Sequence, residues 1–316
     1  MAAGERSPFL SARAPVCPPE LIARARALAR PRVAIARAGA LLPMSAAMQA
    51  TEAGIMEPVF VGEPEDIMRI AERLGWDIAP FRLVGSRGAA EAGFEAAALC
   101  GRGEADILMK GHIHSDLFLK SVMRRDAGLR TRQRLVHVFH ISPPDGGRPL
   151  LVSDAAVNVA PRIRTRQAAT RAVVELLHRL GVECPEVAFL SATETPIASI
   201  PSSIEARALR NWAREAIEGA RFAGPLALDL ILSADSAASK GMEDEPMVGR
   251  ADAIMVPDIV TGNAVFKALV YLSGGCAAGI VLGAKVPLLL TSRADPPAAR
   301  LASVALAVVA SGVGAD

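Results

Sequence analysis

Short apolar runs alternate with amphipathic stretches along the first third of the chain. The runs have the length and the residue types of buried strands, and they are Val33–Ala36, Pro58–Val61, Arg82–Val84 and Ile107–Met109. Between them lie stretches of roughly ten residues with apolar positions at helical spacing, and Gly75 ends the one at Glu65–Leu74. Strands that alternate with helices of this length form βαβ units. The pattern therefore predicts a mostly parallel sheet with helices on its faces.

The same alternation continues in the second half of the chain. Arg166–Leu180 has its apolar residues on one helical face, and Gly181 follows it as a stop signal. Ser202, with Glu205 three residues later, predicts a capping box at the start of a helix that runs through Ile217. A chain of 316 residues is long enough for two domains, at roughly 150 residues per domain.

The stretch Val256–Asp295 is predicted to contain a strand, a turn, a helix, two further strands and a polar exit. The helix is expected to begin at Gly262-Asn263, where free backbone N–H groups and the positive end of the helix dipole suit an anion. The apolar run Val286–Leu290 leads into Thr291-Ser292-Arg293-Ala294-Asp295. The planar fork of Arg293 can bind phosphate with two parallel hydrogen bonds. Ligands of open α/β sheets bind where strands end, so this exit is predicted to bind an anion.

Polar residues also follow several of the other predicted strands. They are Lys110, His114 and Ser115, then Asp154 and Asn158, then Glu194, and finally Asp258 and Asn263. Each of them alone could be an ordinary cap or turn residue. Because such residues recur at strand ends, they predict one binding site in a cleft between the two domains.

The five histidines do not predict a metal site. His112, His114 and Asp116 are close in sequence, but no further acidic or cysteine cluster lies near them. His137 and His140 fall on opposite faces of a strand, so they cannot bind one ion together. We predict no metal ligands and interpret the two strand histidines as structural.

Composition and charge exclude several classes of protein. With 51% apolar and 22% charged residues the chain has enough material for packed cores, and a net charge of +2 gives no field for nucleic acid. The four cysteines are far apart, which predicts reduced thiols in a cytoplasmic protein. Leu269–Leu290 is apolar over the length of a membrane span, but its glycines, Lys285 and Pro287 divide it into shorter elements. Dinucleotide, P-loop and serine-hydrolase motifs are missing from the sequence.

Four segments resemble the phosphate acetyl/butyryl transferase family, and they occur in the family's order: LLVSDAAVNVAP, GPLALDLILS, GRADAIMVPDIVTGNAVFKALVY and AGIVLGAKVPLLLTSRAD. The resemblance runs from about Gly103 to the C-terminus. It is closer to the butyryl branch and to the transferase half of fused hydratase–transferase proteins. It implies an α/β/α fold like that of isocitrate and isopropylmalate dehydrogenases, with two domains around a cleft. We expect domain I at 1–149 plus 291–316, domain II at 150–290, and a homodimer formed through domain II.

The resemblance also implies the reaction, in which acyl-CoA and phosphate give acyl phosphate and CoA by direct attack in a ternary complex. Acyl-CoA and phosphate are then the partners, and no cofactor is needed. The expected catalytic residues are Ser292, Arg293 and Asp295. The expected substrate-binding residues are Lys110, Gly111, His114, Ser115, Lys120, Asn158, Asp258, Gly262, Asn263, Lys267 and Gly283.

Two departures from the acetyl-type pattern bear on these roles. Lys120 lies near a position where acetyl-type members carry arginine, and lysine keeps the charge but loses the fork. Acetyl-type members have an aspartate a few residues after the Ser-Arg pair, where this chain has Pro296-Pro297-Ala298-Ala299. Asp295 is the nearby carboxylate, so the base that activates the CoA thiol stays open. Ser292 and the backbone N–H groups around Gly111 and Gly283 are candidate donors to the attacked carbonyl oxygen.

Three alternative functions stay open at this point. A metal- and NAD-dependent decarboxylating dehydrogenase of the same fold requires an aspartate cluster, which the sequence does not show. A non-catalytic CoA-binding module is at odds with the intact Ser292 and Arg293. A phosphate acyltransferase that uses acyl carrier protein requires a basic docking patch.

Overall fold

The structure is a computed structural model, and it describes residues 7–243, 247–290 and 294–314. The chain folds into two compact units. Unit 1 consists of Met1–Val16 and Val136–Ala277, and unit 2 consists of Cys17–Leu135 and Ala278–Asp316. The chain thus leaves unit 2 after residue 135 and returns to it at residue 278.

These ranges differ from the expected domain boundaries, and strand pairing gives the reason. Strand β5 (Val136–Ser142) pairs antiparallel with β6 (Leu150–Ser153), which keeps residues 136–149 in the same unit as β6. Strand β10 (Cys276–Leu282) pairs antiparallel with β11 (Leu288–Leu289). Since β11 in turn pairs with β4 (Ile107–Lys110), residues 278–290 belong with unit 2.

The strands described in unit 2 follow the order β3-β2-β1-β4-β11-β10. The first three strands along the chain are β1 (Arg32–Ala36), β2 (Glu57–Gly62) and β3 (Arg82–Gly85). All neighbours are parallel except β10 and β11. The predicted parallel sheet is therefore confirmed.

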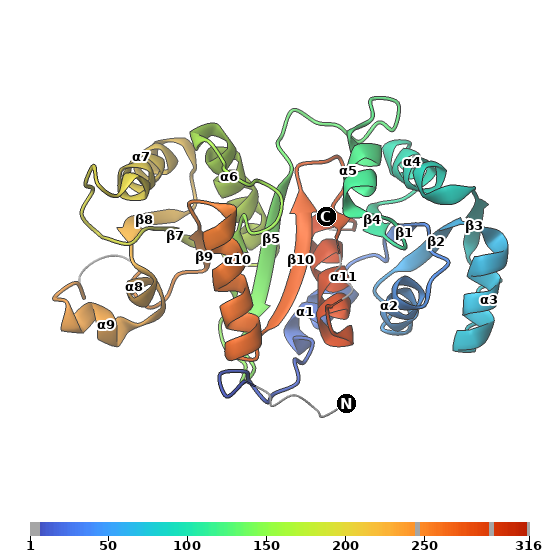
Figure 1. Ribbon diagram of the computed structural model, residues 1–316, viewed down its shortest axis with the longest axis horizontal. Helices are drawn as coiled ribbons and strands as arrows, with labels where there is room; N and C mark the ends of the chain where they lie inside the picture. The colour runs from blue at the N-terminus through green and yellow to red at the C-terminus, as the bar shows by residue number, and fades with distance from the viewer. Residues whose placement is uncertain (1–6, 244–246, 291–293, 315–316) are drawn as a thin grey trace. The chain divides into compact units, whose positions relative to one another are not determined.

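Helices cover both faces of these strands. Figure 1 shows α4 (Gly88–Gly101) and α5 (Ser115–Met123) on one face. The other face carries α2 (Leu41–Glu52), α3 (Pro64–Leu74) and α11 (Pro297–Ser311), as the same view shows. The short helix α1 (Pro19–Arg26) packs against α11.

Unit 1 has the strand order β5-β6-β9-β7-β8. Its later strands are β7 (Glu186–Leu190), β8 (Arg221–Leu226) and β9 (Ala253–Met255), which are parallel to β6. In Figure 1, α6 and α7 lie on one face of these strands, and α8, α9 and α10 lie on the other. The helices are α6 (Ile163–Arg179), α7 (Pro201–Ala216), α8 (Leu228–Leu232), α9 (Ala234–Ser239) and α10 (Ile259–Lys267), which continues as the π-helical turn η1 (Ala268–Leu272).

The apolar runs form the core, as a parallel sheet covered on both faces requires. Val33, Ala34 and Ile35 of β1 are fully buried, and so are Ile107 and Leu108 of β4. No helix in the part of the chain that the structure describes is long and apolar enough to cross a membrane.

The predicted capping box at the start of α7 is wrong. Helix α7 begins at Pro201, so Ser202 lies inside its first turn and its hydroxyl contacts Ser191 at 3.1 Å. The carboxylate of Glu205 pairs instead with Arg166 at 3.0 Å. Pro201 takes the first helical position, where its missing N–H has no helical partner to lose.

Candidate active site

The topology of unit 2 places a switch point between β1 and β4. The chain goes from β1 to β2 and β3 on one side and returns to β4 on the other side of β1. Ligands of doubly wound sheets bind at the carboxyl ends of the two strands at such a point. In this unit the two ends are Ala36 and Lys110, which are register partners.

The two strand exits are joined through Gly111. Its N–H donates to the carbonyl of Ala36 at 2.9 Å, and the next N–H, that of His112, donates to Arg37 at 2.8 Å. A Cβ atom on Gly111 would lie 2.5 Å from the carbonyl oxygens of both Ala36 and Arg37. Glycine is therefore needed here because the two backbones approach closely.

Lys110 and the start of α5 provide positive charge at this edge. The Lys110 ammonium is half-buried and donates to the carbonyl of Ile113 at 3.2 Å. Helix α5 begins at Ser115, and His114 precedes it without giving a side-chain cap. Both His114 and Ser115 are exposed. Uncapped N–H groups at a helix start, together with a nearby ammonium, are suited to an anion.

Lys120 lies away from this edge. It is an exposed residue in the last turn of α5, about 7.5 Å further along the helix axis than Ser115. The structure therefore does not place the Lys120 backbone beside the uncapped N–H groups.

Strand β11 ends at the same edge. It runs parallel to β4 with Leu289 opposite Met109, so both strands end at the switch point. Ser292 and Arg293 follow β11 but lie outside the residues that the structure describes. Asp295 is half-buried, and its backbone oxygen accepts a hydrogen bond from Arg300.

The structure does not bring Gly283 together with Gly111. Strand β10 is antiparallel to β11, so it ends at the edge where β4 begins. Roughly 16 Å of extended strand separates the two edges. At its own edge the Gly283 carbonyl accepts a hydrogen bond from the Thr131 hydroxyl at 2.6 Å, and a Cβ on Gly283 would lie 2.1 Å from the oxygen of Arg134.

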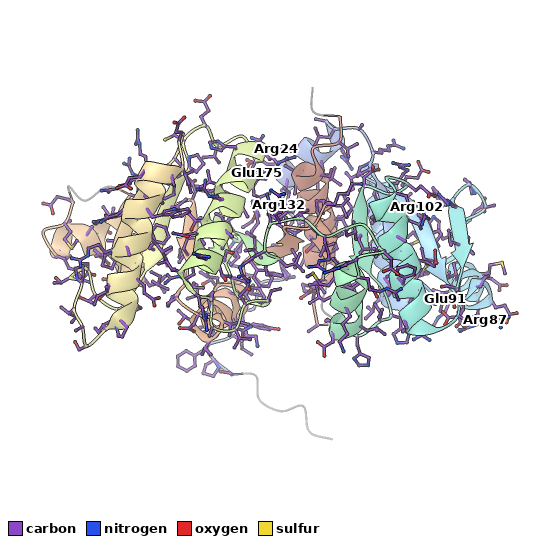
Figure 2. All side chains as sticks on the ribbon, turned by 90° about the horizontal axis from the view of Figure 1, so that it is seen from above. Arg24, Arg87, Glu91, Arg102, Arg132 and Glu175 are labelled. Atoms are coloured by element: carbon purple, nitrogen blue, oxygen red, sulfur yellow. The ribbon has the colours of Figure 1, made fainter. Side chains whose placement is uncertain are left out.

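Helix α4 runs between the same two edges. Arg87 and Glu91 mark its start on the switch-point side, and Arg102 follows its end (Figure 2). The Lys285 ammonium donates to the carbonyl of Gly101 at 2.7 Å, beside Arg102. The turn after β10 is thus held at the Arg102 end of α4.

In unit 1, the structure brings Asp154 and Asn158 together at the end of β6. The buried Asp154 carboxylate accepts hydrogen bonds from the Asn158 amide at 2.6 Å and from the backbone of His137 at 3.1 Å. Its other oxygen accepts from the N–H groups of Ala156 and Val157, both at 2.9 Å. Four donors on one buried carboxylate fix the conformation of this strand exit.

The expected helix start at Gly262-Asn263 is wrong. Helix α10 begins at Ile259, and Asp258 caps it by accepting from the N–H of Thr261 at 2.8 Å. Gly262 is buried, and a Cβ there would lie 2.8 Å from the carbonyl of Asp154. Gly262 therefore allows α10 to pack closely on the exit of β6, and Asn263 and Lys267 lie further along the helix.

Buried titratable groups of unit 1 have shifted pKa values. Burial lowers the pKa of His137 to about 4, against the opposing charge of Asp154, and burial also lowers that of His140 to about 4. Both imidazoles are thus neutral at neutral pH, which agrees with a structural role. Burial lowers the pKa of Arg166 as well, while Glu205 and then Asp258 oppose this shift.

Among the described residues, no group of three or more His, Cys, Asp and Glu side chains could hold a metal ion. The sequence-predicted residues fall into two sets. Unit 2 holds Lys110, Gly111, His114, Ser115 and Asp295 at its switch-point edge. Unit 1 holds Asn158, Asp258, Gly262, Asn263 and Lys267 at and after the ends of β6 and β9.

Comparisons with known proteins agree with this architecture. Residues 89–308 match the family model described as phosphate acetyl/butaryl transferase. A phosphate acetyltransferase from Rhizobium meliloti is 37% identical over 290 residues, which cover 92% of each chain. A phosphate butyryltransferase from Clostridium acetobutylicum is 33% identical over 294 residues, covering 93% of this chain and 97% of the relative.

A solved structure of similar fold is a branched-chain phosphotransacylase from Enterococcus faecalis V583. Its TM-score is 0.77 at 28% identity, and the match covers 89% of this chain and 98% of that one. A phosphotransacetylase from Streptococcus pyogenes has a TM-score of 0.79 at 18% identity, covering 92% and 97%. The predicted α/β/α fold is confirmed.

Proposed function

Because the chain belongs to the phosphate acetyl/butaryl transferase family and is an acyltransferase, we propose that it exchanges a short acyl group between coenzyme A and inorganic phosphate. Acyl-CoA and phosphate give acyl phosphate and CoA, and the exchange is reversible. One relative is named for acetyl transfer and another for butyryl transfer, so these are the acyl groups to test first. The dehydrogenase and the non-catalytic CoA-binding alternatives are not favoured.

The residues at the switch point of unit 2 are the main structural support for this proposal. Lys110 and the uncapped start of α5 lie at the edge where β11 ends, and the sequence continues from β11 into Ser292 and Arg293. An ammonium and free backbone N–H groups bind phosphate oxygens well. The same donors would bind the phosphoryl group of the acyl phosphate in the reverse direction.

The proposed chemistry is a direct attack in a ternary complex. A phosphate oxygen attacks the thioester carbonyl carbon, a C–O bond forms, the C–S bond breaks, and CoA leaves as its thiolate. Negative charge develops on the carbonyl oxygen, and we assign the Ser292 hydroxyl and backbone N–H groups near Gly111 to its stabilisation. Arg293 is assigned to the phosphoryl oxygens. Asp295 is the proposed base for the CoA thiol in the reverse direction.

The remaining sequence-predicted residues stay proposals for binding CoA. Asn158, Asn263 and Lys267 have polar or charged groups on unit 1, and Lys120 has one on unit 2. The reaction as written uses no cofactor and no metal. All four cysteines are free thiols, which supports the proposed cytoplasmic location.

We also propose a homodimer formed through unit 1. The apolar segment made of α10 and η1 buries only Gly262 among its residues. Val260 is 75% exposed, and Tyr271 and Leu272 are 49% and 51% exposed. A helix that is apolar on several sides is ordinarily covered by a partner. The partner that we propose is a second copy of this chain.

A thiol-release assay tests the proposed reaction. Acetyl-, propionyl- and butyryl-CoA are each incubated with the protein, with and without phosphate, and free CoA is measured. We expect phosphate-dependent release that EDTA does not abolish. If no CoA is released from any of the three acyl-CoA substrates, or if its release requires added metal or NAD, the proposal is wrong.

Two variants test separately the roles proposed for Ser292 and Arg293. Arg293→Lys keeps the charge without the fork, so the phosphate KM should rise. Ser292→Ala removes one donor to the carbonyl oxygen and should lower kcat roughly 10²- to 10³-fold, the range for one such donor. Near-normal kinetics in both variants would show that this exit is only a turn.

A further inference from the structure

Arg300 is a buried arginine whose charge has no counter-ion among the described residues. Its side chain is 8% exposed in the first turn of α11, and it is the only charged residue of that helix. Its Nη1 atom donates to the backbone oxygen of Asp295. Its Nε atom is sealed from solvent and has no hydrogen-bond partner. Its Nη2 atom also has no hydrogen-bond partner among the described residues. Unlike Nε, however, Nη2 is not sealed from solvent.

Other arginines of this protein show what the Nε and Nη2 edge normally binds. In Arg32, these two atoms donate to the two oxygens of Asp106 at 3.1 and 3.0 Å. In Arg214, both donate to the carbonyl of Phe222 at 3.1 and 2.9 Å. In Arg300, neither atom of this edge has an acceptor among the described residues, and of the two only Nη2 is open to a ligand. A guanidinium N–H in this position can donate to an oxygen of a carboxylate or a phosphoryl group.

The position of Arg300 is unfavourable for a cation that serves only the fold. Burying a charge without a paired opposite charge is costly. The start of a helix carries partial positive charge, which disfavours a cation there further. An arginine at a helix start that is buried and has no counter-ion among the described residues is better explained by an anion that binds to it.

The edge of unit 2 at which Arg300 lies is the one that ends in the switch point. Helix α11 packs against β4 and β11, which both run toward this edge. Helix α11 begins shortly after the end of β11, and the Arg300 side chain reaches back to Asp295, before the helix start. No side chain caps the start of α11.

We propose that the Nη2 atom of Arg300 donates a hydrogen bond to an oxygen of the transferable phosphoryl group, as inorganic phosphate or as acyl phosphate. This deepens the proposed function and rests on it. Arg300 adds a largely buried guanidinium donor to the same edge as Lys110 and the start of α5. Its third nitrogen, Nη1, fixes the backbone of Asp295 at the same time.

The test compares Arg300→Met, which keeps the length but not the charge, with Arg300→Lys, which keeps the charge but not the fork. We expect the phosphate KM to rise about 10- to 100-fold in R300M, equal to about 1.4–2.8 kcal/mol, and by less in R300K. The thermal shift that inorganic phosphate alone produces in the wild type should disappear in R300M. The shift produced by CoA alone should persist, because Nη2 binds the transferable phosphoryl group and not the diphosphate of CoA. The Tm of R300M without ligand should equal or exceed that of the wild type.

Arg32→Met is the matched control, since it removes an arginine that is paired with Asp106 at the opposite edge of the same sheet. It should lower Tm and leave the phosphate KM and both thermal shifts unchanged. A lower Tm in R300M with an intact phosphate shift would mean that Arg300 only holds the Asp295 backbone, and it would overturn the proposal. Loss of the CoA shift in R300M would overturn it as well. A wild type that binds phosphate but never releases CoA would instead contradict the proposed reaction and leave the binding role of Arg300 standing.

Discussion

The carboxylate of Asp258 accepts hydrogen bonds from the backbone N–H of Thr261 at 2.8 Å and from its hydroxyl at 3.1 Å. Helix α10 therefore begins with a carboxylate from its own sequence. A helix start that carries its own negative charge is no longer free for an anionic substrate. Asp258 is thus a helix-capping residue, although the sequence predicts that it binds substrate.

Two substitutions distinguish the cap from a substrate contact. Asp258→Asn keeps a good capping residue, so we expect the free energy of unfolding to change by less than about 0.5 kcal/mol and CoA release to stay normal. Asp258→Ala removes the cap and should cost about 1 kcal/mol. Urea unfolding and the thiol-release assay measure the two effects. If D258N unfolds normally but loses activity, the charge of Asp258 serves the substrate.

Gly111→Ala should impair both stability and activity. Its Cβ would lie 2.5 Å from two carbonyl oxygens, so the exits of β1 and β4 would have to separate. We expect a loss of about 1–3 kcal/mol, as for overpacking, and a higher phosphate KM because Lys110 moves with the exit. Gly85→Ala is the control, because the nearest atom there, a side-chain carbon of Pro64, would be at an ordinary 3.5 Å. Equal behaviour of the two variants would contradict the close approach at Gly111.

The buried histidines make the stability of unit 1 depend on pH. Their pKa values are about 4 in the folded chain, below the ordinary 6.5. Between these values the unfolded chain binds more protons, so stability is fully present above pH 6.5 and is lost as pH falls toward 4. Each histidine contributes about 3 kcal/mol over this range, as an order of magnitude.

Urea unfolding at pH 4.5, 5.5 and 7.5 measures this slope. Trp212 lies in unit 1 and reports its unfolding by fluorescence when the other tryptophan is replaced by Trp76→Phe. His140→Gln should reduce the slope by about half. His112→Gln removes an exposed imidazole and should leave the slope unchanged. A flat profile in the parent protein would mean that the histidines are not buried in solution.

Val260→Glu should convert the proposed dimer into a folded monomer. A charge at this 75% exposed position is harmless in the monomer but is buried at the proposed contact. Light scattering at micromolar concentration measures the mass. Met68→Glu, at an exposed apolar residue of α3 in unit 2, should stay dimeric. A monomeric wild type would refute the dimer.

Much of the fold follows from local patterns. Strands β1 to β4 and the helix expected at Glu65–Leu74 lie within a few residues of the expected ranges, because buried runs and helical periodicity are local signals. The position of Gly283 depends instead on the direction of β10. That direction is decided by pairing with β11, and a strand–turn–strand pattern does not reveal which edge the turn faces.

The candidate site likewise contains features that local sequence signals predict and features that only the folded structure reveals. Asp258 has the residue type of a helix cap before an apolar run, so the sequence contained the signal for the true start of α10. Thr261-Gly262-Asn263 has the composition of a turn, which favours a later helix start, although Gly262 serves close packing. Arg300 stands out in the sequence as a lone charge in an apolar helix. Only the folded structure reveals that it is buried and which of its nitrogens are unpartnered.

The late return of the chain to unit 2 has a consequence for biosynthesis. Residues 17–135 emerge from the ribosome before residues 136–277, but β11 and α11, which complete their sheet and cover one face, are made after them. Unit 1 can fold while unit 2 still exposes the edge of β4 to chaperones and to other nascent chains. At 5–20 residues per second, translation from residue 136 to the end of β11 takes roughly 10–30 s. Most of unit 2 is therefore translated before unit 1 but completed after it, and a ribosome that stalls soon after residue 277 leaves unit 2 incomplete.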